Sequence, residues 1–160
     1  MALKVGDPAP DFKLPAVLGE KQEDFQLSQR RGQNVILLFY ALDFTPVCSA
    51  ELPSFDEDMA KLAGHGAVVV GISTDSTFCH SAFQKFLGGL NFPLASDRWP
   101  FAEAAKAYGL FPAAKHDFGG VNDRAVFLVD KNGKIAWMKI YELDDQPTVE
   151  EVLEELEKIS

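Results

Sequence analysis

Two cysteines, Cys48 and Cys79, are the residues of this chain with the clearest capacity for chemistry. Cys48 lies between an apolar run that ends at Tyr40 and a segment with helical periodicity. A thiol at a helix start faces unpaired backbone N–H groups and the positive end of the helix dipole, which favour the thiolate. Thr45 adds a hydroxyl three residues upstream. The pattern indicates a reactive thiol at Cys48, the alternative being a buried cysteine that packs as a small apolar residue.

Strand-like and helix-like segments alternate in the first half of the chain. Residues 35–40 and 67–72 are short apolar runs, typical of strands covered on both faces. Between them, apolar residues of 49–64 recur at helical spacing, which predicts one helix. Residues 73–76 could each cap a second helix. This order predicts a βαβ crossover between parallel strands.

The two cysteines each follow one of these predicted strands. Because the carboxyl ends of parallel neighbours meet at one edge of a sheet, where α/β proteins bind ligands, we expect both thiols toward that edge. A shared edge does not imply that the two sulfur atoms are in contact, since Cys48 and Cys79 begin different helices. A disulfide would require their Cα atoms to come within about 7 Å.

The middle of the chain is less regular. Residues 91–97 suggest a short strand that ends at a helix cap, and a helix is expected over 101–108, with Gly109 at its end. Residues 115–122 contain a Gly-Gly pair and are expected to form a surface loop.

The last third of the sequence predicts a β-hairpin followed by a terminal helix. Residues 125–129 and 135–140 flank Asn132-Gly133, which is a strong hairpin signal. A capping box over 148–151 opens an amphipathic helix. The elements together predict one α/β domain over residues 1–160, with a mixed central sheet and helices on both faces.

Composition limits the class of protein. The net charge of −9 and the scattered basic residues argue against a nucleic-acid partner. No apolar run approaches the length of a membrane span or a signal peptide, so we expect a cytoplasmic protein that does not bind membranes.

The two cysteines and three dispersed histidines (His65, His80 and His116) do not match a metal-ligand spacing, and we expect neither metal nor cofactor. The histidines are expected to be structural or solvated.

Residues 43–52, DFTPVCSAEL, resemble the active-site stretch of the peroxiredoxins, which are thiol peroxidases with a thioredoxin-like fold. Similar blocks recur along the chain at residues 5–12, 71–76 with His80, 92–97 and 122–130. Within the family, residues 96–100 and 107–111 look most like the alkyl hydroperoxide reductase E branch, with the bacterioferritin-comigratory branch next. The resemblance therefore covers nearly the whole chain.

The resemblance implies roles for four residues. Cys48 would be the peroxidatic thiolate, Thr45 would hydrogen-bond the attacking sulfur and the peroxide, and Arg124 would supply positive charge to both. Glu51 would accept hydrogen bonds from the arginine. Without the resemblance, Arg124 reads as a solvated residue at the head of a strand, and Glu51 as a carboxylate that favours the first helical turn.

Position 41 departs from the family pattern Pro-x-x-x-Thr-x-x-Cys, because this chain has Ala41 where the pattern has proline. The proline ring usually shields the cysteine from water. We therefore expect Ala41 to give a slower or more easily overoxidised enzyme.

The implied reaction is attack of Cys48 on hydrogen peroxide or an alkyl hydroperoxide, which leaves a sulfenic acid. Cys79 could resolve it through an intramolecular disulfide. Alternatively Cys79 only packs beside Phe78, and an outside thiol resolves Cys48. A thioredoxin- or glutaredoxin-like protein or a low-molecular-weight thiol would then recycle the enzyme. The segment with Trp99 and Phe101 resembles a dimer contact of these peroxiredoxins, which implies a homodimer.

Two other functions compete with this interpretation. A thiol-disulfide oxidoreductase needs a second thiol close to the first, and residues 49–51 supply none. A non-enzymatic redox sensor or binding module would use Cys48 oxidation to change a protein contact. A peroxidase must turn over with a thiol donor, whereas a sensor need oxidise only once.

Overall fold

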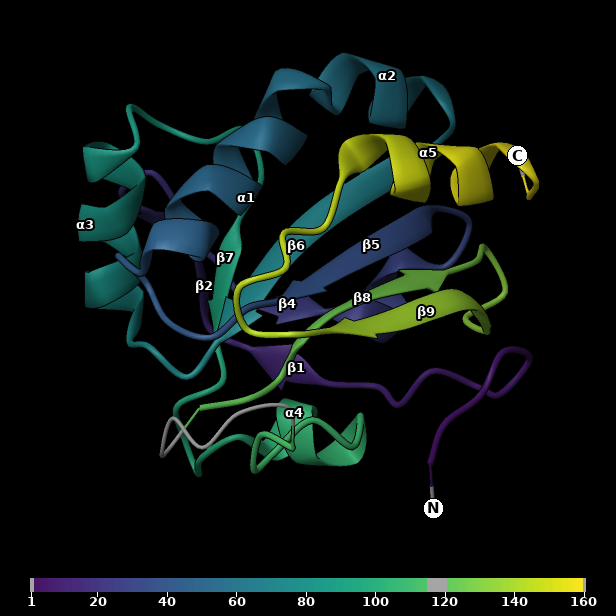
Figure 1. Ribbon diagram of the computed structural model, residues 1–160, viewed down its shortest axis with the longest axis horizontal. Helices are drawn as coiled ribbons and strands as arrows, with labels where there is room; N and C mark the ends of the chain where they lie inside the picture. The colour runs from purple at the N-terminus through teal and green to yellow at the C-terminus, as the bar shows by residue number, and fades with distance from the viewer. Residues whose placement is uncertain (1, 115–120, 160) are drawn as a thin grey trace.

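The computed structural model describes residues 2–114 and 121–159. Most of the predicted loop at 115–122, and His116 with it, therefore lies outside the described residues. Within them the chain forms a seven-stranded sheet and a separate two-stranded ribbon (Figure 1). The sheet order is β3 (Lys21–Gln22), β2 (Ala16–Leu18), β7 (Leu94–Ser96), β6 (Ala67–Ser73), β5 (Asn34–Phe39), β8 (Arg124–Val129) and β9 (Ile135–Tyr141). The ribbon pairs β1 (Lys13–Leu14) with β4 (Phe25–Gln26).

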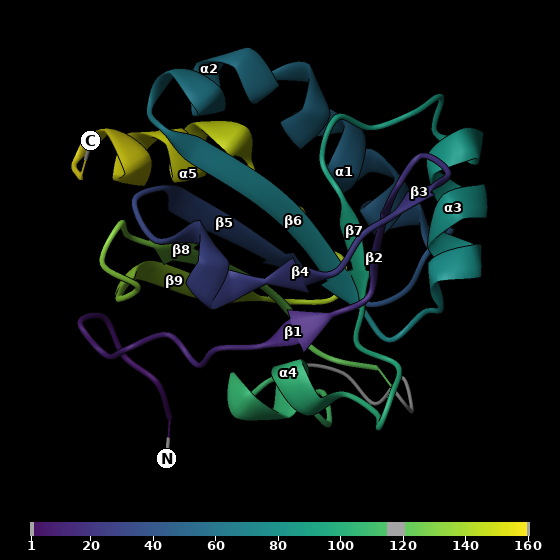
Figure 2. The same ribbon diagram turned by 180° about the vertical axis from the view of Figure 1, so that it is seen from behind.

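Helices cover both faces of the sheet, as the sequence predicts (Figures 1 and 2). They are α1 (Pro46–Glu57), α2 (Met59–Gly64), α3 (Thr77–Phe86), α4 (Glu103–Ala107) and α5 (Val149–Glu157), with a 3-10 turn η1 at Leu27–Arg30. None of the helices in the described ranges is long and apolar enough to cross a lipid bilayer.

Alternation along β5 divides the core into two layers. Ile36 and Leu38 face one layer, which is completed by residues of α1, α2 and α5. Val35, Leu37 and Phe39 face the other, which includes residues of α4. Because successive side chains of a strand point to opposite faces, a run of six buried residues is what a strand covered on both sides requires. Since β5 pairs in parallel with β6 and antiparallel with β8, the predicted mixed sheet is confirmed.

The helix predicted over 49–64 is two helices rather than one. At Asp58 the backbone N–H donates to the Phe55 carbonyl three residues back, which tightens the chain and ends α1. The Asp58 carbonyl then accepts from Leu62 and starts α2. The apolar stripe survives the break, since Leu52, Phe55 and Leu62 all enter the same core layer.

The helix predicted over 101–108 is also shorter, and begins only at Glu103. Phe101 and Ala102 have positive φ angles of 139° and 54°, which exclude them from a right-handed helix. The Asp97 carboxylate accepts hydrogen bonds from the backbone of Ala104 and Ala105 and so holds the first turn. Gly109 ends the segment with a φ of 74°, as predicted.

The backbone confirms the prediction that the two cysteines follow parallel strands toward the same edge of the sheet. Strands β5 and β6 are parallel and paired up to Phe39 and Ile72. The next backbone bond runs from the Tyr40 N–H to the Ile72 carbonyl. The segments that lead into α1 and α3 therefore leave the sheet side by side, and each carries one cysteine in its first helical turn.

Candidate active site

Cys48 lies in the first turn of α1, at the junction of strand and helix that the sequence predicts. Thr45 is the N-cap residue in an extended conformation, and Pro46 occupies the start of the helix, where its missing N–H costs nothing. The Cys48 side chain is fully buried in the core layer that also contains Tyr40 and Ala41. The thiol is thus held at a helix N-terminus and shielded from bulk water.

Arg124 brings a positive charge to this thiol from strand β8, on the same face of the sheet. It is the first residue of β8, which pairs antiparallel with β5, so its side chain starts beside the carboxyl end of β5. Its Nη1 lies 3.1 Å from the Cys48 Sγ and 2.6 Å from the Glu51 Oε1. Nε and Nη2 donate to the Leu143 carbonyl at 3.1 and 2.9 Å. Arg124 is only 1% exposed, so its interpretation as a solvated residue is wrong.

Glu51 lies one helical turn after Cys48 and is fully buried. Burial raises the pKa of Glu51 to about 7, although the Arg124 guanidinium acts in the opposite direction. Burial likewise disfavours the charge of Arg124, but Cys48 and Glu51 raise the pKa of Arg124 above its ordinary value. Glu51 is thus a buried hydrogen-bond partner of Arg124. The alternative interpretation, a carboxylate in the first helical turn, is wrong, because α1 begins at Pro46 and has no acidic residue in its first turn.

Thr45 lies at the mouth of the site. Its hydroxyl donates to the Leu42 carbonyl at 2.9 Å rather than to Cys48. The oxygen keeps lone pairs that can accept a hydrogen bond from a ligand. Beside it is a pocket of about 330 Å³, lined by Thr45, Pro46, Val47, Arg124, Leu143 and Asp144. The pocket gives a small molecule access to Arg124 and to the start of α1.

Ala41 occupies the position where the family pattern has proline. Its side chain is fully buried in the same core layer as Cys48. The sulfur therefore remains completely buried without the proline ring. Whether Ala41 changes the rate or the ease of overoxidation stays a prediction.

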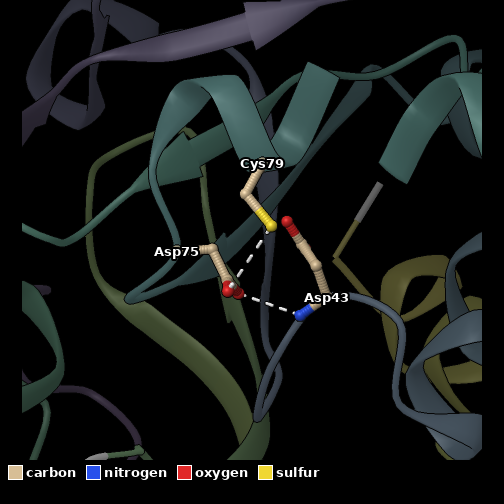
Figure 3. A group of neighbouring side chains, drawn as sticks. All are labelled: Asp43, Asp75 and Cys79. Atoms are coloured by element: carbon tan, nitrogen blue, oxygen red, sulfur yellow. Dashed lines mark hydrogen bonds between the residues drawn. The ribbon is translucent and has the colours of Figure 1, made fainter. Parts of the chain in front are cut away.

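Cys79 has different surroundings from Cys48, and both are free thiols. Its backbone N–H donates to the Ser76 capping oxygen at 3.1 Å, and its Sγ lies 3.8 Å from Asp75 Oδ1. Figure 3 shows the sulfur directed toward the carboxyl groups of Asp75 and Asp43. Burial and these two carboxylates raise the pKa of Cys79 to about 12. The environment therefore keeps this thiol protonated.

A buried polar network around Asp43 escaped the sequence interpretation. Asp43 accepts from the Tyr40 hydroxyl at 2.6 Å and contacts His80 Nδ1 at 2.7 Å. His80 Nε2 lies 3.0 Å from the Ala95 carbonyl, so both ring nitrogens face acceptors. The Asp43 N–H donates to Asp75 at 2.9 Å. This network ties the segment before Cys48 to α3 and β7, so His80 is buried and hydrogen-bonded rather than solvated.

Asp43, Asp75 and Cys79 also place possible metal-ligand atoms within 4.8 Å of one another. The Asp43 oxygens already contact Tyr40 and His80, and Asp75 accepts from the Ser73 hydroxyl at 2.6 Å. The cluster is therefore satisfied by hydrogen bonds inside the protein. The expectation of no metal site stays a prediction.

Sequence comparison identifies relatives over most of the chain. The profile of the AhpC/TSA family matches residues 5–138. Peroxiredoxin tpx1 of Schizosaccharomyces pombe is 38% identical over 159 residues, which cover 96% of this chain and 80% of the relative. Peroxiredoxin-2 of Macaca fascicularis is 35% identical over 159 residues, or 94% of this chain and 76% of the relative.

Solved structures agree with these relatives. The reduced 2-Cys peroxiredoxin of Plasmodium vivax superposes with a TM-score of 0.86 at 30% identity, over 96% of this chain and 80% of that one. AhpC of Mycobacterium tuberculosis gives a TM-score of 0.86 at 26% identity, over 99% and 98% of the two chains. The thioredoxin-like fold expected from the sequence is confirmed, while these names do not distinguish the branch within the family.

Proposed function

Since this chain belongs to the AhpC/TSA family of peroxiredoxins, we propose that it is a thiol peroxidase with Cys48 as the nucleophile. One observation carries the assignment of the residue: Arg124 Nη1 donates to the buried Cys48 Sγ at 3.1 Å. A guanidinium keeps its charge at any physiological pH, and its hydrogen bond favours a thiolate over a thiol. The start of α1 adds unpaired N–H groups.

In the proposed reaction, a hydroperoxide enters the pocket beside Thr45 and Arg124. The Cys48 thiolate attacks the terminal oxygen, the O–O bond breaks, and water or an alcohol leaves. Cys48 becomes a sulfenic acid. Arg124 is placed to stabilise both the attacking sulfur and the negative charge that develops on the leaving oxygen. Hydrogen peroxide and alkyl hydroperoxides are the proposed substrates.

Thr45 is proposed to orient the peroxide by accepting its O–H. Replacing Thr45 with valine keeps the shape of the side chain and removes the acceptor. We expect the second-order rate of Cys48 oxidation to fall about tenfold, the equivalent of one hydrogen bond of roughly 1–1.5 kcal/mol. Stopped-flow fluorescence measures this rate, and Thr45→Ser is the matched control that keeps the hydroxyl. Equal rates in Thr45→Val and wild type would exclude the role.

The sulfenic acid is proposed to be reduced by an external thiol rather than by Cys79. Attack requires a thiolate, whereas burial, Asp43 and Asp75 raise the pKa of Cys79 to about 12. Suitable donors are a thioredoxin- or glutaredoxin-like protein or a low-molecular-weight thiol.

Turnover of Cys79→Ser tests this proposal. With hydrogen peroxide and excess dithiothreitol, we expect the variant to retain the wild-type rate within about twofold, because the resolving thiol comes from outside. Wild-type protein oxidised with one equivalent of peroxide should show no two-proton loss of mass. Loss of turnover in Cys79→Ser, together with that mass loss in wild type, would instead make Cys79 the resolving cysteine.

The same turnover assay separates a peroxidase from a redox sensor. A peroxidase consumes many equivalents of peroxide per protein as long as the thiol donor lasts. A sensor stops after Cys48 has been oxidised once. A thiol-disulfide oxidoreductase is disfavoured because residues 49–51 carry no second thiol.

The homodimer and the cytoplasmic location remain proposals. Trp99 supports the dimer, since its side chain is 84% exposed and aromatic residues are enriched in protein interfaces. Light scattering of the purified protein measures its oligomeric state directly.

A further inference from the structure

Three ionisable groups share one buried volume, and only one of them is a cation. Cys48 and Glu51 are both fully buried, and Arg124 is 1% exposed. Their shared contact is a single nitrogen, Arg124 Nη1, which donates to both Cys48 Sγ and Glu51 Oε1. If both acids were ionised, the cluster would hold a net negative charge away from water. Such a charge is costly, so an arrangement with one proton more is favoured.

The second oxygen of Glu51 shows where that proton belongs. Oε1 accepts from Arg124, whereas the buried Oε2 has no hydrogen-bond partner among residues 2–114 and 121–159. If Glu51 were ionised, Oε2 would carry negative charge without accepting a hydrogen bond. A carboxylic acid leaves only a neutral group there, which costs less to bury. Burial also raises the pKa of Glu51 to about 7, in agreement with this geometry.

Among the residues that the structure describes, the other ionisable groups near Glu51 do not supply a compensating positive charge. From β9, Tyr141 donates its hydroxyl to Glu151 of α5, and burial with the nearby acids raises the pKa of Tyr141. The pKa of Glu151 is lowered by this hydrogen bond and by Lys139. Lys139 pairs with Glu151 at 3.0 Å on the partly exposed surface. Arg124 remains the cation that Cys48 and Glu51 must share.

We propose that Glu51 holds the proton that Cys48 gives up, and releases it to the leaving oxygen when Cys48 is oxidised. The inference rests on the proposed function. Before reaction, the cluster consists of a thiolate, a carboxylic acid and a guanidinium. The thiolate attacks the terminal peroxide oxygen, an S–O bond forms, and the O–O bond breaks. The Glu51 proton ends on the departing hydroxide or alkoxide, which gives water or an alcohol.

The cluster is neutral on both sides of this step. After reaction, Cys48 is a neutral sulfenic acid, and the Glu51 carboxylate balances Arg124. The buried site therefore never holds an uncompensated charge. Glu51 would thus assist catalysis as a proton store, in addition to positioning Arg124.

Counting protons during oxidation tests this proposal. Reduced protein carrying Cys79→Ser is mixed with one equivalent of hydrogen peroxide in weak buffer that contains a pH indicator. At about pH 6 we expect no net proton uptake, because the proton comes from Glu51. Uptake should rise toward one proton per Cys48 as the pH passes about 7 and Glu51 starts ionised. Adding Glu51→Gln should give uptake of one proton at both pH values.

Glu57→Gln is the matched control, since Glu57 lies on the same helix but is exposed, and it should follow the parent protein. Uptake of one proton by the parent protein at about pH 6 would show that Glu51 is already a carboxylate and would overturn the inference. Net release of a proton would also overturn it. In either case oxidation of Cys48 would still support the proposed function, which fails only if no sulfenic acid forms. If Glu51→Gln does not fold, the ultraviolet absorbance of the Cys48 thiolate in the parent protein decides the matter: the proposal requires the thiolate to be present already at about pH 6, and a thiol at that pH would overturn it.

Discussion

Cys48→Ser is expected to abolish peroxide-dependent oxidation of a thiol donor, with turnover at least about 10⁴-fold below wild type. Serine keeps the size of the side chain, so the packing around Arg124 and Glu51 should survive. Its hydroxyl does not ionise at neutral pH and forms no sulfenic acid, so the nucleophile is lost. Steady-state consumption of dithiothreitol with hydrogen peroxide measures the effect.

Cys79→Ser provides the comparison for Cys48→Ser, because it removes the other thiol of the chain. If Cys48→Ser kept its activity while Cys79→Ser lost it, the nucleophile would be Cys79. Circular dichroism of both variants establishes that the fold is retained. The pattern of the two variants therefore assigns the reactive thiol.

Arg124→Met is expected to slow Cys48 oxidation by about 10²–10³-fold, since it removes the charge that faces the sulfur and the leaving oxygen. It should also destabilise the fold by about 1–3 kcal/mol, because the buried Glu51 carboxyl group loses its hydrogen-bond donor. Stopped-flow oxidation gives the rate, and urea unfolding gives the free energy. Arg98→Met, at an exposed position, should change neither.

The double variant Arg124→Met with Glu51→Met separates these two effects. Replacing both partners with apolar side chains removes the stranded carboxyl group, so we expect stability to recover toward wild type. The rate should remain low, because the guanidinium is still absent. A rate that recovered together with stability would mean that Arg124 serves only to hold the fold.

The sequence places Cys48 correctly because its position depends on local signals. An apolar run of strand length ends at residue 40, and helical spacing begins a few residues later. The parallel pairing of β5 and β6 follows from the crossover between them, which brings Cys79 to the same sheet edge. Short-range patterns were sufficient for these features.

The partners of Cys48 could not be predicted in this way. Arg124 lies far away in the sequence, and only the antiparallel pairing of β8 with β5 brings it to the thiol. Its interpretation as a solvated residue failed because charge alone does not reveal burial. The resemblance to a family supplied Arg124 and Glu51, and the structure shows the nitrogen that they share with Cys48.

The network of Tyr40, Asp43, Asp75 and His80 was missed for a similar reason. Its members come from three segments, and none has a spacing that marks a buried cluster. Tyr40 and Asp43 directly after a buried strand were the available signal, since polar residues at a strand's carboxyl end often serve a site. The sequence also could not predict the break at Asp58, because the apolar stripe continues through it.

The most direct test of Cys48 as the nucleophile is to locate the residue to which hydrogen peroxide adds one oxygen atom. Reduced wild-type protein is treated with one equivalent of hydrogen peroxide, the sulfenic acid is trapped with a carbon nucleophile, and the adduct is located by peptide mass spectrometry. We expect stoichiometric labelling of Cys48 and an unlabelled Cys79. Labelling of Cys79 with an unmodified Cys48 would contradict it.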